Sequence, residues 1–167
     1  MERPACTAIT EEGPSNIFVQ MVKQESGSNE CGACTVAMLT DRSRDEILAD
    51  VPDPQMPDYF WLNYMSRLGF TVKDVRDDVG FDKTKTCDGL IFKGYFQLAR
   101  GHRYYCSLVT AKGVHAVAID EAGMVFDPST TAPAIGTCTL EQYVRINHHP
   151  PHNSTVRCFR VKSNKAH

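Results

Sequence analysis

Between residues 24 and 39, a polar, glycine-bearing segment runs directly into small, mostly apolar residues. This change predicts a loop that enters a helix, which we place over residues 30–41 with Ser28 or Asn29 as its cap. From Ala33 to Leu39 the helix offers apolar groups on most of its sides. Such a helix is covered by other elements, so the rest of the chain is expected to pack around it.

Cys31 lies where this loop becomes the helix. Backbone N–H groups point outward at a helix N-terminus and the dipole favours negative charge there, so we expect a thiol pKa below the ordinary value of about 8.5. Gly32 is expected to leave space beside the sulfur for a second backbone or a substrate. The Gln24 amide is close enough to return across the loop and face the thiol. A cysteine here is more often a small buried residue, so a chemical role requires partners elsewhere in the chain.

The remaining pattern predicts helices in the first half of the chain and antiparallel strands in the second, which defines the α+β class. Glycines between the later strands favour tight turns and therefore a meander. The C-terminal strand is expected at an edge of the sheet. The expected helices cover residues 30–41, 44–49, 58–68 and 139–146, and the expected strands cover 70–75, 103–110, 114–120, 124–127 and 155–161.

His115 starts the second strand of this meander and Asp127 ends the third. Antiparallel pairing across a short turn brings their side chains nearly opposite each other, and Pro128 stops the strand there. An aspartate that accepts from one ring nitrogen orients the imidazole, and the other nitrogen can then take a thiol proton. Each residue also has an ordinary structural interpretation: a histidine whose hydrogen bonds are satisfied within the strand, and an aspartate that forms part of a turn. Together with Cys31, however, the two residues predict a Cys-His-Asp site.

These motifs resemble the papain-like cysteine peptidases of the double-glycine-leader, or bacteriocin-processing, type and their stand-alone relatives. The resemblance implies a papain-like fold, in which an N-terminal helical half with a central cysteine-bearing helix packs on a C-terminal antiparallel sheet. It implies that Cys31 is the nucleophile, that His115 is the general base and acid, that Asp127 orients His115, and that Gln24 is the oxyanion-hole donor. The matching residues are Gln24, Asn29–Gly32, Ala37–Leu39, Leu62–Phe70, Gly113–Val117 and Asp127–Pro128.

The run from Cys31 to Cys34 also resembles the start of the papain and cathepsin motif, in which the second cysteine attacks. That alignment makes Cys34 the nucleophile. However, Thr35 then replaces the aromatic residue of that motif, and Cys34 lies a turn deeper in an apolar helix. We therefore favour Cys31. The chain departs from the bacteriocin-processing pattern in two further ways. The small residues after Gly32 are offset by one position, and the hairpin that joins His115 to Asp127 is short. No membrane or ATPase segment accompanies the motifs, so the transporter role of the best-known members is not expected.

The chain has 167 residues, of which 23% are charged, and a formal net charge of −2. This balance argues against partners such as nucleic acid or an anionic membrane. No apolar run approaches the roughly eighteen residues of a membrane span, and the first residues contain no signal-peptide core. We therefore expect a cytoplasmic protein. Its domains would be a flexible arm over residues 1–16, a single papain-like domain over 17–163 and a tail over 164–167.

The seven cysteines are odd in number and widely scattered, so without an export signal we expect reduced thiols. Cys106 and Cys158 lie in strand-like runs and are expected in the core. Cys31 and Cys34 have the spacing of a zinc or redox pair, but the sequence has no second Cys/His pair to complete a tetrahedral site. We expect no metal and no cofactor.

The function that this reasoning predicts is thiol-dependent hydrolysis of a peptide or isopeptide bond in a peptide or protein substrate. Two alternatives stay open. A Cys-His-Asp set also serves amidases and acyltransferases. A catalytically weak papain-like fold can instead act as a protein-binding module, or as an inhibitor of a host factor, through loops at residues 76–89 and 128–137.

Overall fold

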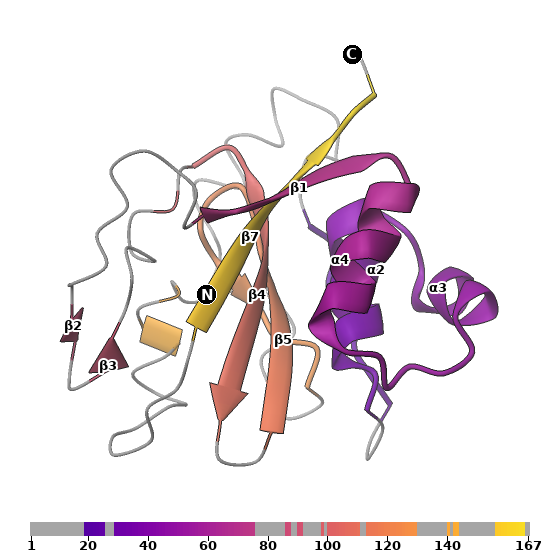
Figure 1. The fold of residues 1–167 in the computed structure, drawn as a ribbon, viewed down its shortest axis with the longest axis horizontal. Helices are drawn as coiled ribbons and strands as arrows, with labels where there is room; N and C mark the ends of the chain where they lie inside the picture. The colour runs from indigo at the N-terminus through magenta and orange to yellow at the C-terminus, as the bar shows by residue number, and fades with distance from the viewer. Residues whose placement is uncertain are drawn as a thin grey trace.

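The computed structural model describes residues 19–25, 29–75, 86–87, 90–91, 98, 100–110, 113–129, 140, 142–143 and 156–165. Within these ranges, three helices lie on one side of a five-stranded antiparallel sheet (Figure 1). The α+β class is therefore confirmed. The arm predicted over residues 1–16 lies outside the described residues, as does most of the two loops at 76–89 and 128–137. Within the described part of the chain, no helix has the length and apolarity needed to cross a membrane.

The three helices begin and end within two residues of the predicted positions. Helix α3 is opened by Ser43, whose hydroxyl accepts from the Glu46 N–H while the Glu46 carboxylate accepts from the Ser43 N–H. This reciprocal capping box satisfies two backbone donors that the helix itself leaves unpaired. Gly69 stops α4 from continuing because its φ of 96° is readily adopted only by glycine. The helices are α2 (Cys31–Thr40), α3 (Arg44–Asp50) and α4 (Asp58–Arg67).

Helix α2 is the most deeply buried element, as its apolar sequence predicts. Every residue after Cys31 in this helix is buried. The cap, however, differs from the prediction: Glu30 occupies the N-cap position and makes no side-chain capping bond, so the expectation for Asn29 is wrong. Ser28 lies outside the described residues. The backbone N–H groups of the first turn are therefore left for other partners. The Gly32 N–H, for example, bonds to the Cys31 sulfur.

The sheet has the order β1-β7-β4-β5-β6, so β7 pairs with β1 on one side and with β4 on the other. The prediction of an edge position for the C-terminal strand is wrong. Burial explains the interior position, because β7 has apolar residues in the cores on both faces, for example Cys158 on one and Phe159 on the other. The strands are β1 (Phe70–Asp74), β4 (Arg103–Thr110), β5 (Gly113–Ile119), β6 (Val125–Phe126) and β7 (Val156–Ser163), with β2 (Thr86–Cys87) and β3 (Leu90–Ile91) forming a separate pair.

The sheet separates two hydrophobic cores. The first core lies on the helical side, where α2 and α4 pack on Tyr105, Ala116, Ala118 and Phe159. The second core lies on the opposite face, where Cys106, Val117 and Cys158 meet Leu140 and Tyr143. Cys106 and Cys158 are buried free thiols with sulfurs 3.7 Å apart, as the sequence predicted for core cysteines. The meander β4-β5-β6 is also confirmed.

Candidate active site

Helix α2 presents Cys31 at its first position, partly exposed and with a free thiol. The residue before it, Glu30, is buried and forms a bidentate ion pair with Arg44 of α3, at 2.7 Å to Nε and 2.8 Å to Nη2. Glu30 Oε1 also accepts a hydrogen bond of 3.3 Å from the Glu25 N–H. Bidentate pairing of this kind is strong and directional. The start of α2 and the preceding loop are therefore held in one arrangement around Cys31.

Gly32 allows a close packing contact that the sequence did not predict. A Cβ atom at this position would lie 2.4 Å from Nε1 of Trp61, much closer than real contacts allow. The Trp61 indole is buried in the first core and donates a 3.2 Å hydrogen bond to the Met56 carbonyl. The space beside Gly32 is thus filled by this side chain of α4. Gly32 also lines the cavity that opens beside Cys31, so the expectation of space beside the sulfur stays a prediction.

His115 and Asp127 are brought together by the hairpin of β5 and β6. Nε2 of His115 lies 2.8 Å from Oδ1 of Asp127. The register pairs Ala118 with Phe126, so Asp127 continues opposite Val117, two residues from His115. The pair is therefore a diagonal one across the hairpin, which is within reach of these side chains. Because this bond uses Nε2, the ring keeps Nδ1 for another partner.

The His115 ring also interacts with Cys31, both through a side-chain hydrogen bond and through its charge. Burial alone would raise the pKa of Cys31, but the hydrogen bond to His115, the charge of that ring and the N–H groups of Ala116 and Gly32 together lower it. Burial likewise opposes charge on His115. Its hydrogen bonds to Asp127 and Cys31 nevertheless raise the pKa of His115 to about 10. Both shifts act in the same direction, because each favours the charged form of its own group: thiolate on Cys31 and imidazolium on His115.

Asp127 accepts three hydrogen bonds that hold it in place and ionised. Oδ1 accepts from His115 and from the Ser129 N–H at 2.8 Å, and Oδ2 accepts from the Tyr143 hydroxyl at 2.5 Å. Burial opposes ionisation, but the bond to His115, its charge, and the bonds from Tyr143 and Ser129 lower the pKa of Asp127. An aspartate held in this way orients the imidazole and stabilises its charged form.

Tyr143 is the site residue that sequence reasoning missed. It lies in the predicted helix 139–146, of which Leu140, Gln142 and Tyr143 are described and helical. The ring packs in the second core while the hydroxyl reaches Asp127. No local sequence signal separates this tyrosine from one that only packs, because the contact depends on how the helix meets the sheet.

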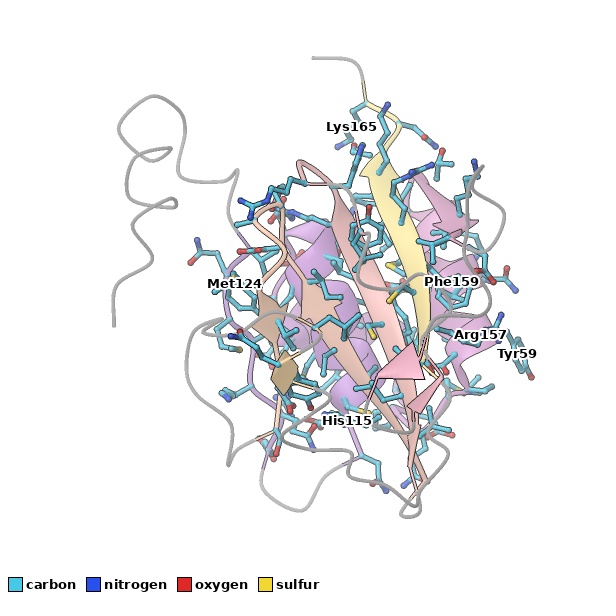
Figure 2. All side chains as sticks on the ribbon, turned by 90° about the vertical axis from the view of Figure 1, so that its left-hand side faces the viewer. Tyr59, His115, Met124, Arg157, Phe159 and Lys165 are labelled. Carbon is cyan, nitrogen blue, oxygen red and sulfur yellow. The ribbon has the colours of Figure 1, made fainter. Side chains whose placement is uncertain are left out.

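Gln24 lies on the Asp127 side of the site. Its backbone N–H donates a 3.0 Å hydrogen bond to the Pro128 carbonyl, and its side-chain oxygen is buried. The neighbouring Lys23 ammonium donates to the carbonyls of Asp127 and Ser129 at 3.1 and 2.8 Å. The segment that carries Gln24 is therefore fastened to the segment that carries Asp127. Asp127 in turn bonds to His115, which is labelled in Figure 2.

Cys34, the alternative nucleophile, is fully buried in the first turns of α2. Burial and the nearby charge of Glu30 raise the pKa of Cys34 to about 12. A thiol with that pKa is almost entirely protonated at neutral pH and is a poor nucleophile. The physical contrast between the two cysteines therefore favours Cys31 as the reactive one.

Two cavities border α2, one at each end. The larger, about 970 Å³, lies at the C-terminal end, where Arg103 pairs with Asp41 and Glu121 at 2.9 Å each. Arg103, Asp41 and Glu121 are thus matched to one another. The smaller, about 590 Å³, opens beside Cys31, and we place the candidate site there.

Among the residues that the structure describes, no three His, Cys, Asp or Glu side chains gather as ligands for a metal ion. No protein-family model matches this sequence, and no curated protein is significantly similar to it.

Proposed function

We propose that this protein is a cysteine peptidase that hydrolyses a peptide or isopeptide bond through Cys31, His115 and Asp127. One observation carries the proposal: the His115 ring bonds through Nε2 to a largely buried carboxylate and also interacts with the thiol at the N-terminus of α2. A papain-like architecture is part of the proposal. It is supported by the cysteine-bearing helix packed on an antiparallel sheet that supplies the histidine.

In the proposed reaction, the Cys31 thiolate attacks the carbonyl carbon of the scissile amide, and the carbonyl π electrons move to the oxygen. The oxyanion accepts hydrogen bonds from the Cys31 N–H and from the Gln24 amide. The tetrahedral intermediate collapses as the C–N bond breaks, and the His115 imidazolium gives its proton to the leaving nitrogen. Neutral His115 then takes a proton from water, whose oxygen attacks the thioester and releases the acid and the thiolate.

The experiment that tests this proposal is alkylation of the native protein by iodoacetamide, read by peptide mass mapping, alongside hydrolysis of a pool of quenched peptides. We expect Cys31 to react faster than the other thiols at pH 6–7, and His115→Ala to remove that advantage. Cys31→Ala should abolish hydrolysis, whereas Cys34→Ala, a matched change in the same helix, should leave it intact. Hydrolysis that survives Cys31→Ala would exclude the mechanism.

The same experiment separates the alternatives. A binding module with an inactive triad would react slowly at Cys31, at the rate of the other accessible thiols, and would cleave no peptide. An amidase or acyltransferase would react quickly at Cys31, but it would form products from small amides or acceptor amines in place of cleaved peptides.

A further inference from the structure

The groove beside Cys31 is where the described part of the chain exposes its large apolar side chains. Tyr59 of α4 is 70% exposed and Val114 of β5 is 57% exposed, and both line this groove. Met56 and Trp61 extend the same wall. Exposed apolar groups that gather in one cavity mark a surface that a ligand covers. The volume, about 590 Å³, suits a few residues of an extended peptide.

Arg157 of β7 gives this groove a positive charge. Its Nη2 lies 3.3 Å from Asp74 Oδ2, and its Cζ lies 4.9 Å from the centroid of the Phe159 ring. The buried Nε donates to no acceptor among the described residues. Figure 2 draws Arg157 near Tyr59, and both residues border the same cavity. The guanidinium is thus held in orientation, and its side chain is 42% exposed. Its exposed N–H groups, rather than the buried Nε, are the donors that a ligand carboxylate could reach.

Among the described residues that line the groove, Asp58 is the other charged one, but both of its carboxylate oxygens already accept hydrogen bonds. Oδ1 accepts a 2.7 Å hydrogen bond from the Tyr105 hydroxyl, and Oδ2 accepts one from the Ser107 hydroxyl. These bonds fasten the start of α4 to β4. A substrate cation would have to compete with two hydroxyl donors at Asp58, whereas a substrate carboxylate meets the exposed part of the Arg157 guanidinium. The contrast favours an acidic ligand.

We infer that the groove binds a peptide with an acidic side chain, which pairs with Arg157, next to an apolar side chain, which packs against Tyr59 and Val114. This inference rests on the proposed function of Cys31 and names the substrate class of the same site. The scissile bond would lie within a few residues of the acidic side chain, because Cys31 borders the same groove. Orientation by Asp74 and Phe159 lowers the entropic cost of the ion pair.

The test uses internally quenched octapeptides in which each position in turn carries Glu, Gln or Lys. The wild-type protein should prefer Glu to Gln by about tenfold in kcat/KM at one position, as a charge-assisted hydrogen bond predicts. Arg157→Gln, which keeps a polar side chain over Phe159, should remove the preference. Arg157→Glu should reverse it toward Lys. Arg160→Glu makes the same charge change on the opposite face of β7 and should leave the preference unchanged.

The outcomes separate this inference from the proposed function. Cleavage without a preference for Glu, or a preference that survives Arg157→Glu, overturns the acidic substrate class and leaves the peptidase intact. No cleavage of any peptide, combined with ordinary reactivity of the Cys31 thiol, removes both. Binding of the preferred Glu peptide and its Gln counterpart to Cys31→Ala, measured by fluorescence anisotropy, should differ in the same direction as turnover. Equal affinity there would count against Arg157 as the anchor.

Discussion

Tyr143→Phe removes one oxygen atom from the site and leaves the ring in the second core. The Tyr143 hydroxyl donates a 2.5 Å hydrogen bond to Oδ2 of Asp127, whose side chain is only 12% exposed. A hydrogen bond to a charged group of this kind contributes about 1.5–3 kcal/mol, whereas one to a neutral group contributes about 0.5–1.5 kcal/mol. We expect the free energy of unfolding at pH 7 to fall by the larger amount, which lowers the melting temperature by roughly 3–10 °C in a protein of this size.

The pH dependence of this effect has a definite sign. The pKa of Asp127 is lowered in the folded protein, so ionised Asp127 stabilises the fold above its ordinary value of 3.8, and this contribution is lost as the pH falls through the folded pKa. The destabilisation by Tyr143→Phe should therefore be largest at pH 7 and shrink at pH 3. The variant should also need a higher pH for half-maximal alkylation of Cys31, because a less firmly ionised Asp127 gives weaker support to the His115 imidazolium.

Urea unfolding at pH 7 and pH 3, with iodoacetamide kinetics from pH 4 to pH 9, measures both effects. Tyr59→Phe is the matched control for stability, because Tyr59 is 70% exposed and its hydroxyl is expected to contribute little. The reasoning fails if Tyr143→Phe loses the same free energy at both pH values and alkylates Cys31 with an unchanged pH profile. That result would mean that the hydroxyl does not stabilise the charge on Asp127.

Three further predictions follow from contacts around the thiol. Gly32→Ala should lower the free energy of unfolding by about 1–3 kcal/mol in denaturant titration, because the new methyl group would overlap the buried Trp61 indole; a stabilised variant would contradict the packing. Glu30→Gln should loosen the start of α2 and slow Cys31 alkylation, because Arg44 loses its bidentate partner; an unchanged rate would show that this ion pair does not order the site. The rate of peptide hydrolysis should follow a bell-shaped pH profile. It should rise through the lowered pKa of Cys31 and fall near pH 10, where His115 loses its proton. A profile that only rises would contradict this assignment.

Local sequence signals were sufficient to predict where the main helices and strands lie. They were insufficient to predict which strands pair with each other. The predicted bounds 44–49 and 58–68 lie within one residue of α3 and α4, because a cap such as Ser43 or a stop such as Gly69 depends on only a few consecutive residues. The interior position of β7 depends on pairing with β1 and β4, which lie far away in the chain. A signal was nevertheless present: Phe159 and Cys158 are adjacent apolar residues on opposite faces, a pattern typical of a strand covered on both sides.

The contacts of the candidate site also fall into predictable and unpredictable ones. The hairpin between β5 and β6 made the proximity of His115 and Asp127 predictable, because a short turn fixes which residues face each other. The contact between Tyr143 and Asp127 and the packing of Trp61 on Gly32 were not predictable. Both depend on the distance between packed elements, and residue spacing along the chain carries no information about that distance.

The residues of the candidate site belong to two different hydrophobic cores. Cys31 packs with the first core on the helical side of the sheet, whereas Tyr143, which supports Asp127, belongs to the second core on the opposite face. His115 on β5 lies between them and interacts with Asp127 and with Cys31. We therefore expect the interaction between Cys31 and His115 to depend on the packing of both faces of the sheet. A substitution deep in the second core, such as Leu140→Ala, should reduce the reactivity of Cys31 without touching it, whereas a site built from α2 alone would keep its reactivity.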